Sequence, residues 1–254
     1  MTLPLLQDVI EDSEFVVISH RWRTPVIAEI GLRPVREHMN YVAGQYVLIS
    51  DTAYDIPVRS YSVANAPEPS GLISVFVTEV PGGATSTWLT RRLQVGDTVL
   101  VSGPYGTFVR DPASRAPVTC LAGGSGLAPI RALAQEAVCG GLDLPFTVIF
   151  SARTERDVVD QDLFDSWSAR AGHFRFVRTL TRSDGAPPLG RIPDVLTDIV
   201  PDLTGHDVFV CGSPGFVKAS ANAARSAGAA AGQVHTEEFF AEPEPWTSAS
   251  ETEA

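Results

Sequence analysis

Four consecutive residues, Arg59, Ser60, Tyr61 and Ser62, carry side chains that could bind a flat, phosphorylated cofactor. An arginine offers a planar fork of donors for phosphate, and an aromatic ring can stack on a flat ring system. A hydroxyl can donate to a nitrogen that gains charge on reduction. On a strand, Arg59 and Tyr61 would point one way, and Ser60 and Ser62 the other. Taken alone, the four residues would be an ordinary strand with an exposed arginine.

Two glycine-rich segments could bring backbone close to phosphate groups. Residues 82–86 read Gly-Gly-Ala-Thr-Ser before a helical stretch, although Gly-Gly is also a common hairpin turn and Ser86 could be a simple N-cap. Residues 123–129 read Gly-Gly-Ser-Gly-Leu-Ala-Pro between an apolar strand and a helix, where a pyrophosphate binds well. Pro129 replaces the third glycine of G-x-G-x-x-G, which weighs against a standard Rossmann dehydrogenase.

The second half of the chain adds three arginines and two short motifs. Arg153, Arg182 and Arg191 follow predicted strands, and ligands bind at strand ends in such sheets, so these side chains could converge. Each alone would be a solvated surface arginine. Residues 211–214, Cys-Gly-Ser-Pro, end a strand and begin a helix, and residues 237–239 read Glu-Glu-Phe.

The elements that must position these motifs change character near residue 112. Before it, short strands rich in Val, Ile and aromatics predict an antiparallel Greek-key β-barrel. These strands are expected at residues 15–20, 25–32, 45–50, 60–64, 73–80 and 98–102, with a helix at 86–93. After it, strands alternate with helices, which predicts an α/β doubly wound parallel sheet. The expected strands are 118–122, 146–150, 175–181 and 208–211, and the expected helices are 129–138, 161–169, 192–199 and 216–227.

Taken in this order, the motifs resemble those of the ferredoxin–NADP reductase superfamily, whose members take a hydride from NAD(P)H and pass electrons on. The resemblance runs from about residue 10 to residue 240. It implies an FAD-binding barrel at residues 1–112 and an NAD(P)-binding α/β domain at 113–241. Residues 242–254 remain as an acidic tail, which we expect to be disordered.

The resemblance implies a role for each motif of the barrel. Arg59 would pair with the flavin pyrophosphate, Tyr61 would pack on the isoalloxazine, and Ser62 would hydrogen-bond the ring nitrogen that accepts hydride. Val75 and Val77 would line the cofactor through their backbone. The implied contacts of a tightly bound FAD are Arg59, Ser60, Tyr61, Ser62, Val75, Val77, Gly83, Ala84, Thr85, Ser86, Ser125 and Phe239. Members of the family often end near a Tyr or Trp, whereas this chain continues, so Phe239, Phe240 or Trp246 could cover the flavin.

The family also implies a nicotinamide site in the second domain. Its implied residues are Gly123, Gly124, Gly126, Arg153, Thr181, Arg182, Arg191, Cys211, Gly212 and Pro214. Arginines in matching motifs surround the 2′-phosphate of NADPH in bacterial members, which favours NADPH. NADH-using members carry the first arginine and often a Gly-Arg-Ile, so NADH stays an alternative. Ser62, Cys211 and Glu237 are the implied catalytic residues, which would orient the reacting atoms.

The implied activity is electron transfer from NAD(P)H through FAD to a separate ferredoxin. An oxygenase reduced directly, free-flavin reduction and a non-catalytic flavin-binding regulatory subunit are the alternatives. The net charge of −11 argues against nucleic-acid binding. Three cysteines cannot supply the four thiolates of a plant-type iron–sulfur cluster, and we expect no metal site. We expect a cytoplasmic protein, because no apolar run reaches the about 20 residues of a membrane span and the first residues lack the pattern of a secretory signal. We also expect a monomer.

Overall fold

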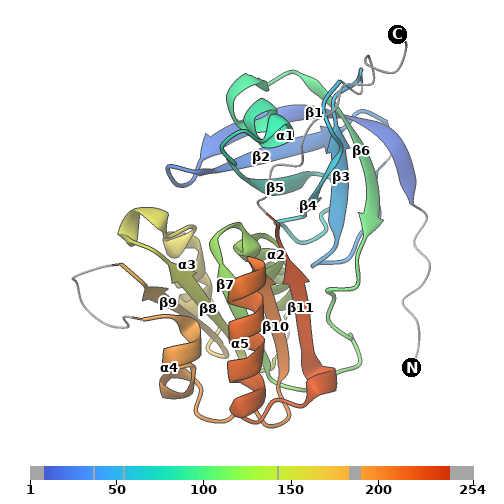
Figure 1. The fold of residues 1–254 in the computed structure, drawn as a ribbon. Helices are drawn as coiled ribbons and strands as arrows, with labels where there is room; N and C mark the ends of the chain where they lie inside the picture. The colour runs from blue at the N-terminus through green and yellow to red at the C-terminus, as the bar shows by residue number, and fades with distance from the viewer. Residues whose placement is uncertain (1–8, 37, 54, 142, 183–189, 241–254) are drawn as a thin grey trace.

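The computed structural model describes residues 9–36, 38–53, 55–141, 143–182 and 190–240, in two layers of structure (Figure 1). The acidic tail and Trp246 lie outside the described residues. None of the described helices combines the length and apolar character that crossing a membrane requires.

The first layer is an antiparallel sheet of six strands that curls into a near-closed barrel (Figure 1). Along the sheet the strands run β4-β3-β6-β1-β2-β5. Their bounds are β1 (Ile10–Trp22), β2 (Ile27–Pro34), β3 (Tyr46–Ser50), β4 (Arg59–Ser62), β5 (Ile73–Thr78) and β6 (Thr98–Tyr105). Alternate side chains such as Phe15, Val17 and Ile30 are fully buried and fill the interior.

The two outermost strands of the barrel meet at residues 63–65 and 72–75, which we call the barrel seam. Val63 forms an antiparallel bridge with Val75, and the Ala64 N–H donates to the Ser74 carbonyl at 2.7 Å. The Asn65 side chain accepts from the Ser74 N–H at 2.7 Å and donates to the Leu72 carbonyl at 3.0 Å. These bonds join β4 to β5 and nearly close the barrel.

The second layer is a parallel sheet of five strands in the order β11-β10-β7-β8-β9. The strands are β7 (Val118–Gly123), β8 (Phe146–Ala152), β9 (Phe174–Leu180), β10 (Asp207–Gly212) and β11 (Val234–Glu238). From β7 the chain adds β8 and β9 on one side and then β10 and β11 on the other side, so the order of strands reverses between β7 and β10. Ligands bind at this point in doubly wound folds. Barrel and parallel sheet together confirm the predicted fold class.

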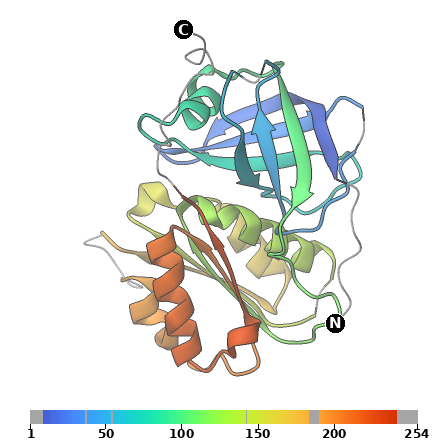
Figure 2. The same cartoon turned by 45° about the vertical axis from the view of Figure 1, so that its right-hand side comes forward.

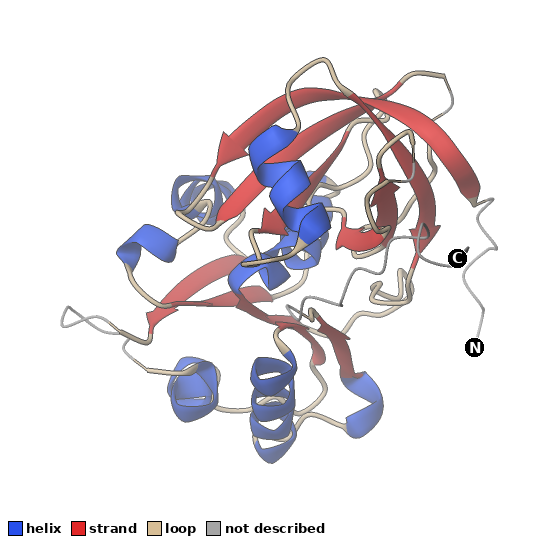
Figure 3. Cartoon of the chain, turned by 45° about the horizontal axis from the view of Figure 1, so that its top comes forward, coloured by secondary structure: helices blue, strands red, loops and turns tan. Residues whose placement is uncertain are grey.

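Helices cover both faces of the parallel sheet (Figure 3). They are α2 (Leu127–Cys139), α3 (Gln161–Arg170), α4 (Ile192–Ile199) and α5 (Pro214–Ser226). Helices α2 and α3 share one hydrophobic core with barrel residues including Phe76 and Phe108, whereas α4 and α5 pack on the other face. Helix α2 therefore lies between the sheet and the barrel (Figure 2).

Two details differ from the sequence prediction. Strand β11 was not predicted. It overlaps the motif at residues 237–239, and its side chains are exposed or only half-buried, so the sequence shows no apolar run there. The predicted helix at 86–93 is instead α1 (Ala84–Thr87) followed by a π-helical turn over Trp88–Arg92. Leu89 anchors this turn in the barrel core.

Candidate functional site

The predicted motif on β4 reaches across to the last strand of the parallel sheet. Ser62 is buried, and its hydroxyl donates a hydrogen bond to the Glu237 carboxylate on β11. Tyr61 is half-buried, and burial raises the pKa of its phenol, while the nearby Arg59 charge opposes that shift. Ser60 is exposed. The motif therefore lies where the two sheets face each other.

Cys211 and Glu237 are neighbours at this junction, because they are register partners in the parallel pair β10 and β11. Burial raises the pKa of the Cys211 thiol well above its usual range, and the Glu237 carboxylate adds to that shift. Cys211 is therefore an uncharged thiol at neutral pH. Burial also raises the pKa of Glu237 to about 6, against the lowering effect of the Ser62 hydrogen bond. The fold thus brings together Ser62, Cys211 and Glu237, the three predicted catalytic residues.

The glycine-rich segment after β7 turns close to this group of residues. A Cβ added at Gly126 would lie 2.4 Å from the Cys211 carbonyl oxygen, so only glycine fits there. Gly124 has a φ of +58°, and nothing lies within 4 Å of where its Cβ would be. The Ser125 hydroxyl accepts a hydrogen bond from the Thr78 hydroxyl of β5 at 2.8 Å. The segment therefore contacts the barrel on one side and offers open backbone on the other.

The second glycine motif forms a turn that leads into α1. Gly82 has a φ of +78°, with open space around it. The Ser86 hydroxyl accepts from the Val80 N–H at 3.1 Å and donates to the Gly83 carbonyl at 3.3 Å. The Thr85 hydroxyl donates to the Pro57 carbonyl at 2.5 Å. These hydroxyls brace the turn, and the first N–H groups of the helix, including that of Ala84, have no partner within the helix.

The three predicted arginines follow the ends of β8 and β9, at the same edge of the sheet. The Arg182 N–H donates to the Arg153 carbonyl at 2.8 Å, and the Thr181 N–H donates to the Ala152 carbonyl at 3.0 Å. The Gly190 N–H donates to the Leu180 carbonyl at 3.0 Å, which returns the chain to the end of β9 just before Arg191. All three arginines are exposed.

Comparisons with known proteins give this geometry a family. A model of the oxidoreductase FAD-binding domain matches residues 16–109, and one of the oxidoreductase NAD-binding domain matches residues 120–222. Reductase component 1 of the terephthalate 1,2-dioxygenase of Comamonas sp is 32% identical over 231 residues, which is 89% of this chain and 68% of that protein. Ferredoxin–NADP reductase B of Sorangium cellulosum is 30% identical over 214 residues, 80% of this chain and 86% of that one.

The chain belongs to the ferredoxin–NADP reductase superfamily. The crystal structure of the Amycolatopsis cytochrome P450 reductase GcoB covers 94% of this chain and 73% of its own, with a TM-score of 0.86 and 27% identity. A carbazole 1,9a-dioxygenase ferredoxin reductase matches over 93% of this chain and 71% of its own, with a TM-score of 0.82 and 26% identity. The chain is therefore an FAD-dependent NAD(P)H oxidoreductase of this superfamily.

The residues of the reductase fit both nucleotides. FAD and NAD(P)H carry pyrophosphates, which need positively polarised backbone and little side-chain bulk. The open glycines at 82 and 124 leave that space in the barrel and in the parallel layer, respectively. The turns that follow β7 and β10 also contain small residues. Strand β7 ends at Gly123, β10 ends at Gly212, and α5 begins at Pro214.

The remaining predicted flavin contacts lie in different settings. The side chains of Val75 and Val77 are fully buried in the barrel core, so only their backbone could face a cofactor. The Phe239 N–H donates to the Gly212 carbonyl at 2.8 Å, and its ring packs partly against the core under α2. Phe240 is 74% exposed. Of the aromatics predicted to cover the flavin, Phe239 is thus the one, within the described residues, whose backbone is bonded to the end of β10.

Sequence reasoning missed the polar residues that join the two layers. Thr78 has no motif to mark it, and its contact with Ser125 depends on how barrel and sheet dock. Arg131 and Asp160 are 7% and 8% exposed, although both carry charge. The signal for Arg131 was available, because it is the single charge among residues 127–134 at the start of α2.

Proposed function

We propose that this reductase oxidises NADPH and passes the two electrons, one at a time, to a separate ferredoxin. Each NADPH gives up a hydride to become NADP+, so one turnover reduces two ferredoxin molecules and releases one proton. Bound FAD would link the steps, because a flavin accepts electrons as a pair and returns them singly. The Ser62–Glu237 hydrogen bond carries the proposal, because it joins the flavin-binding motif to the nucleotide domain beside Cys211.

In this proposal the barrel holds FAD. The Arg59 guanidinium and the backbone of residues 83–86 bind its pyrophosphate, and Tyr61 packs on its ring system. Because the Ser86 hydroxyl already braces the turn, we assign the phosphate contact there to backbone N–H groups rather than to hydroxyls. Phe239 covers the face that nicotinamide must reach.

In this proposal Ser62, Glu237 and Cys211 orient the reacting atoms and control protons. The Ser62 hydroxyl donates to Glu237 and can turn toward a flavin nitrogen instead. Glu237, with a pKa of about 6, can hold a proton at a site shielded from bulk water and return it near neutral pH. The uncharged Cys211 thiol is fully buried beside Glu237, and it would help to hold the end of β10 in place next to the nicotinamide.

The edge of the sheet formed by β8 and β9 supports NADPH as the donor. Arg153, Arg182 and Arg191 offer three positive charges where a 2′-phosphate would lie, and guanidinium groups bind phosphate through paired hydrogen bonds. Replacing Arg182 by alanine should raise the KM for NADPH by about tenfold or more and leave the KM for NADH unchanged. Arg115→Ala, which removes an exposed arginine between the two layers, is the matched control. Equal effects on both nucleotides would favour NADH.

The relatives support a protein acceptor. The Sorangium relative is named a ferredoxin–NADP reductase, and the Comamonas relative is a reductase component of a dioxygenase. The second candidate acceptor is therefore an oxygenase component reduced directly. Free-flavin reduction and a non-catalytic flavin-binding role are further alternatives, and we propose that the chain acts as a monomer.

The first test is the visible spectrum of the purified protein, followed by anaerobic addition of NADPH and of NADH. We expect a yellow protein that bleaches at a much lower concentration of NADPH than of NADH. A plant-type ferredoxin and free FMN are then offered as acceptors in separate assays. Reduction of the ferredoxin supports the proposal, and reduction of FMN alone favours a flavin reductase. A protein that stays colourless after addition of FAD contradicts the flavin assignment.

A further inference from the structure

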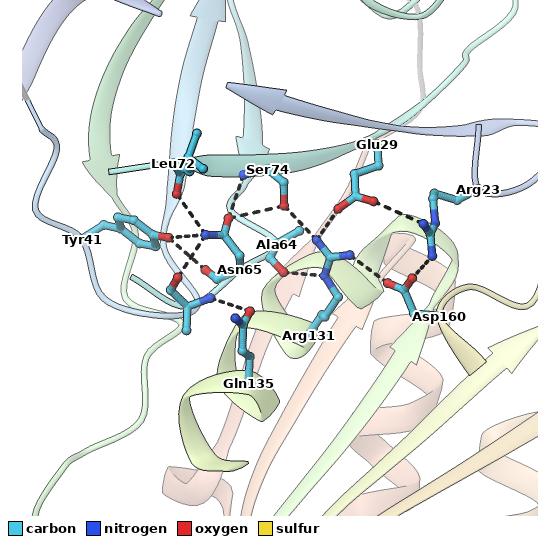
Figure 4. Close-up of polar contacts among 11 residues, drawn as sticks. Arg23, Glu29, Tyr41, Ala64, Asn65, Leu72, Ser74, Arg131, Gln135 and Asp160 are labelled. Carbon is cyan, nitrogen blue, oxygen red and sulfur yellow. Dashed lines mark hydrogen bonds and ion pairs between the residues drawn. The ribbon is translucent and has the colours of Figure 1, made fainter. Parts of the chain in front are cut away.

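Two arginines and two carboxylates form a closed ring of alternating charge between the barrel and the parallel layer (Figure 4). Arg23 and Glu29 belong to the hairpin of β1 and β2, whereas Arg131 lies on α2 and Asp160 immediately before α3. Arg131 pairs with Glu29 at 2.6 Å and with Asp160 at 2.8 Å. Arg23 pairs with the second Asp160 oxygen and lies 3.6 Å from Glu29. Two of the four pairs, Arg131–Glu29 and Arg23–Asp160, cross from one layer to the other.

Arg131 also donates hydrogen bonds to both sides of the barrel seam. Its Nε donates to the Ala64 carbonyl at 2.6 Å, and one of its terminal nitrogens donates to the Ser74 hydroxyl at 2.8 Å. Its guanidinium lies 4.4 Å from the centre of the Phe76 ring. A single side chain of the parallel layer thus holds both strands that close the barrel (Figure 4).

Asp160 is held in a conformation that needs such support. Its side chain is 2% exposed, and its backbone has a φ of +59°, which non-glycine residues rarely adopt. Backbone of this kind persists where surrounding contacts fix it, and it clusters at functional positions. Two guanidinium groups hold the carboxylate, Arg131 from the same layer and Arg23 from the barrel, so one of the two charges that compensate its burial comes from the other layer.

Ala64 and Ser74, which Arg131 contacts, lie close in sequence to residues of the candidate site. Ala64 lies two residues after Ser62, whose hydroxyl contacts Glu237. Ser74 lies four residues before Thr78 on β5, and Thr78 contacts Ser125 in the glycine-rich segment. The Ser62–Glu237 and Thr78–Ser125 hydrogen bonds are therefore made by the same two strands that Arg131 holds.

We propose that Arg131 is a positioning residue that, through this ring, fixes the flavin-binding strands relative to the nicotinamide-binding segment and so aligns hydride transfer. The effect on hydride transfer rests on the proposed function, whereas the coupling of the two layers by Arg131 does not. Arg131 touches neither nucleotide in this proposal, and it acts through Ala64 and Ser74.

The decisive variant is Arg131→Met, which keeps most of the aliphatic length and removes every donor. We expect the variant to purify with FAD and to bind NADP+ within about twofold of wild type, because neither binding motif is changed. Flavin reduction at saturating NADPH should slow by about 10- to 100-fold, because a displacement near 1 Å has that cost. Arg131→Lys, which retains one charge, should recover part of the rate.

Arg91→Met is the matched control. Arg91 makes a two-bonded ion pair with Glu79 at 2.8 and 2.6 Å, but both residues belong to the barrel, so this pair does not join the layers. Its loss should leave the hydride-transfer rate within about twofold of wild type. If Arg131→Met cannot be purified, Ser74→Ala replaces it, because that change removes one of the two contacts through which Arg131 acts and keeps the charged ring.

Thermal unfolding of the purified protein without added NADPH or NADH gives a second, independent readout. Wild type should unfold in one transition and Arg131→Met in two, because the layers would no longer unfold together. An unchanged hydride-transfer rate in Arg131→Met, or in Ser74→Ala where it replaces that variant, overturns the inference. So does a wild type that already unfolds in two steps. If neither NADPH nor NADH reduces wild type, the proposed function fails, and the unfolding comparison alone decides whether Arg131 couples the layers.

Discussion

Gly126 is the position where the smallest possible change should disturb the site most. A methyl group added there would lie 2.4 Å from the Cys211 carbonyl oxygen, 2.5 Å from its carbonyl carbon and 2.7 Å from the Gly212 nitrogen. All three atoms are backbone, so no side chain can rotate away. Ordinary contact begins at 3.4 Å, so the segment and the end of β10 must separate by about 1 Å.

This separation has two measurable costs. Overpacking of this kind lowers the free energy of unfolding by about 1–3 kcal/mol. In a chain of this size each kcal/mol lowers Tm by about 2–4 °C. Because the same movement separates the glycine-rich segment from Cys211, flavin reduction by NADPH should slow by about 100-fold. Anaerobic stopped-flow absorbance and thermal unfolding measure the two effects on one preparation.

The control for Gly126→Ala is Gly172→Ala. Gly172 has ordinary backbone geometry and nothing within 4 Å of its added Cβ, so its change should stay within about 0.5 kcal/mol. A Gly126→Ala protein with wild-type Tm and reduction rate would refute the reasoning. It would mean that the approach of the segment to β10 is loose enough to absorb a methyl group.

Three further predictions follow from single contacts. Glu237 has a folded-state pKa of about 6 against an ordinary 4.5, so the folded protein binds the extra proton in that window. The contribution of Glu237 to the free energy of unfolding is complete below about pH 4.5, and about 2 kcal/mol of it is lost as the pH rises through 6. Denaturant titrations at the two pH values measure this loss, and Glu237→Gln should not show it. Thr78→Val should cost about 1 kcal/mol of unfolding free energy in wild type but nothing in a Ser125→Ala background, as a double-mutant cycle would reveal. Gly124→Ala should bind FAD normally yet weaken NADP+ binding in fluorescence titrations, because its backbone is left-handed and faces open space.

The fold was predictable because its elements repeat simple periods. In the barrel, alternate residues of strands such as β1 and β6 are buried, and the spacing of apolar residues in the sequence indicates this. In the second layer, Val118–Gly123 and Phe146–Ala152 are nearly continuous apolar runs, as expected for strands covered on both faces. Strand β11 was missed because it lies at the edge of the sheet, and its five residues show neither pattern.

The candidate site was predictable where motif residues end strands. Cys211 and the segment at 123–126 end neighbouring strands β10 and β7, so knowing the sheet order is enough to bring them together. The contact between Ser62 and Glu237 is different, because these residues lie in separate layers and 175 positions apart. The family resemblance suggested their proximity, whereas periodicity alone could not have done so.

The residues that escaped prediction share one physical property, which is polarity in a buried place. Patterns of apolar spacing assign a residue such as Arg131 or Asp160 to solvent, because burying an isolated charge is very costly. The cost is offset here in part by partners from the other layer, Glu29 for Arg131 and Arg23 for Asp160, and those pairs exist only after the layers have docked. A charge inside an otherwise apolar stretch of helix is therefore informative. In α2 it marks the face on which a second layer must supply the opposite charge.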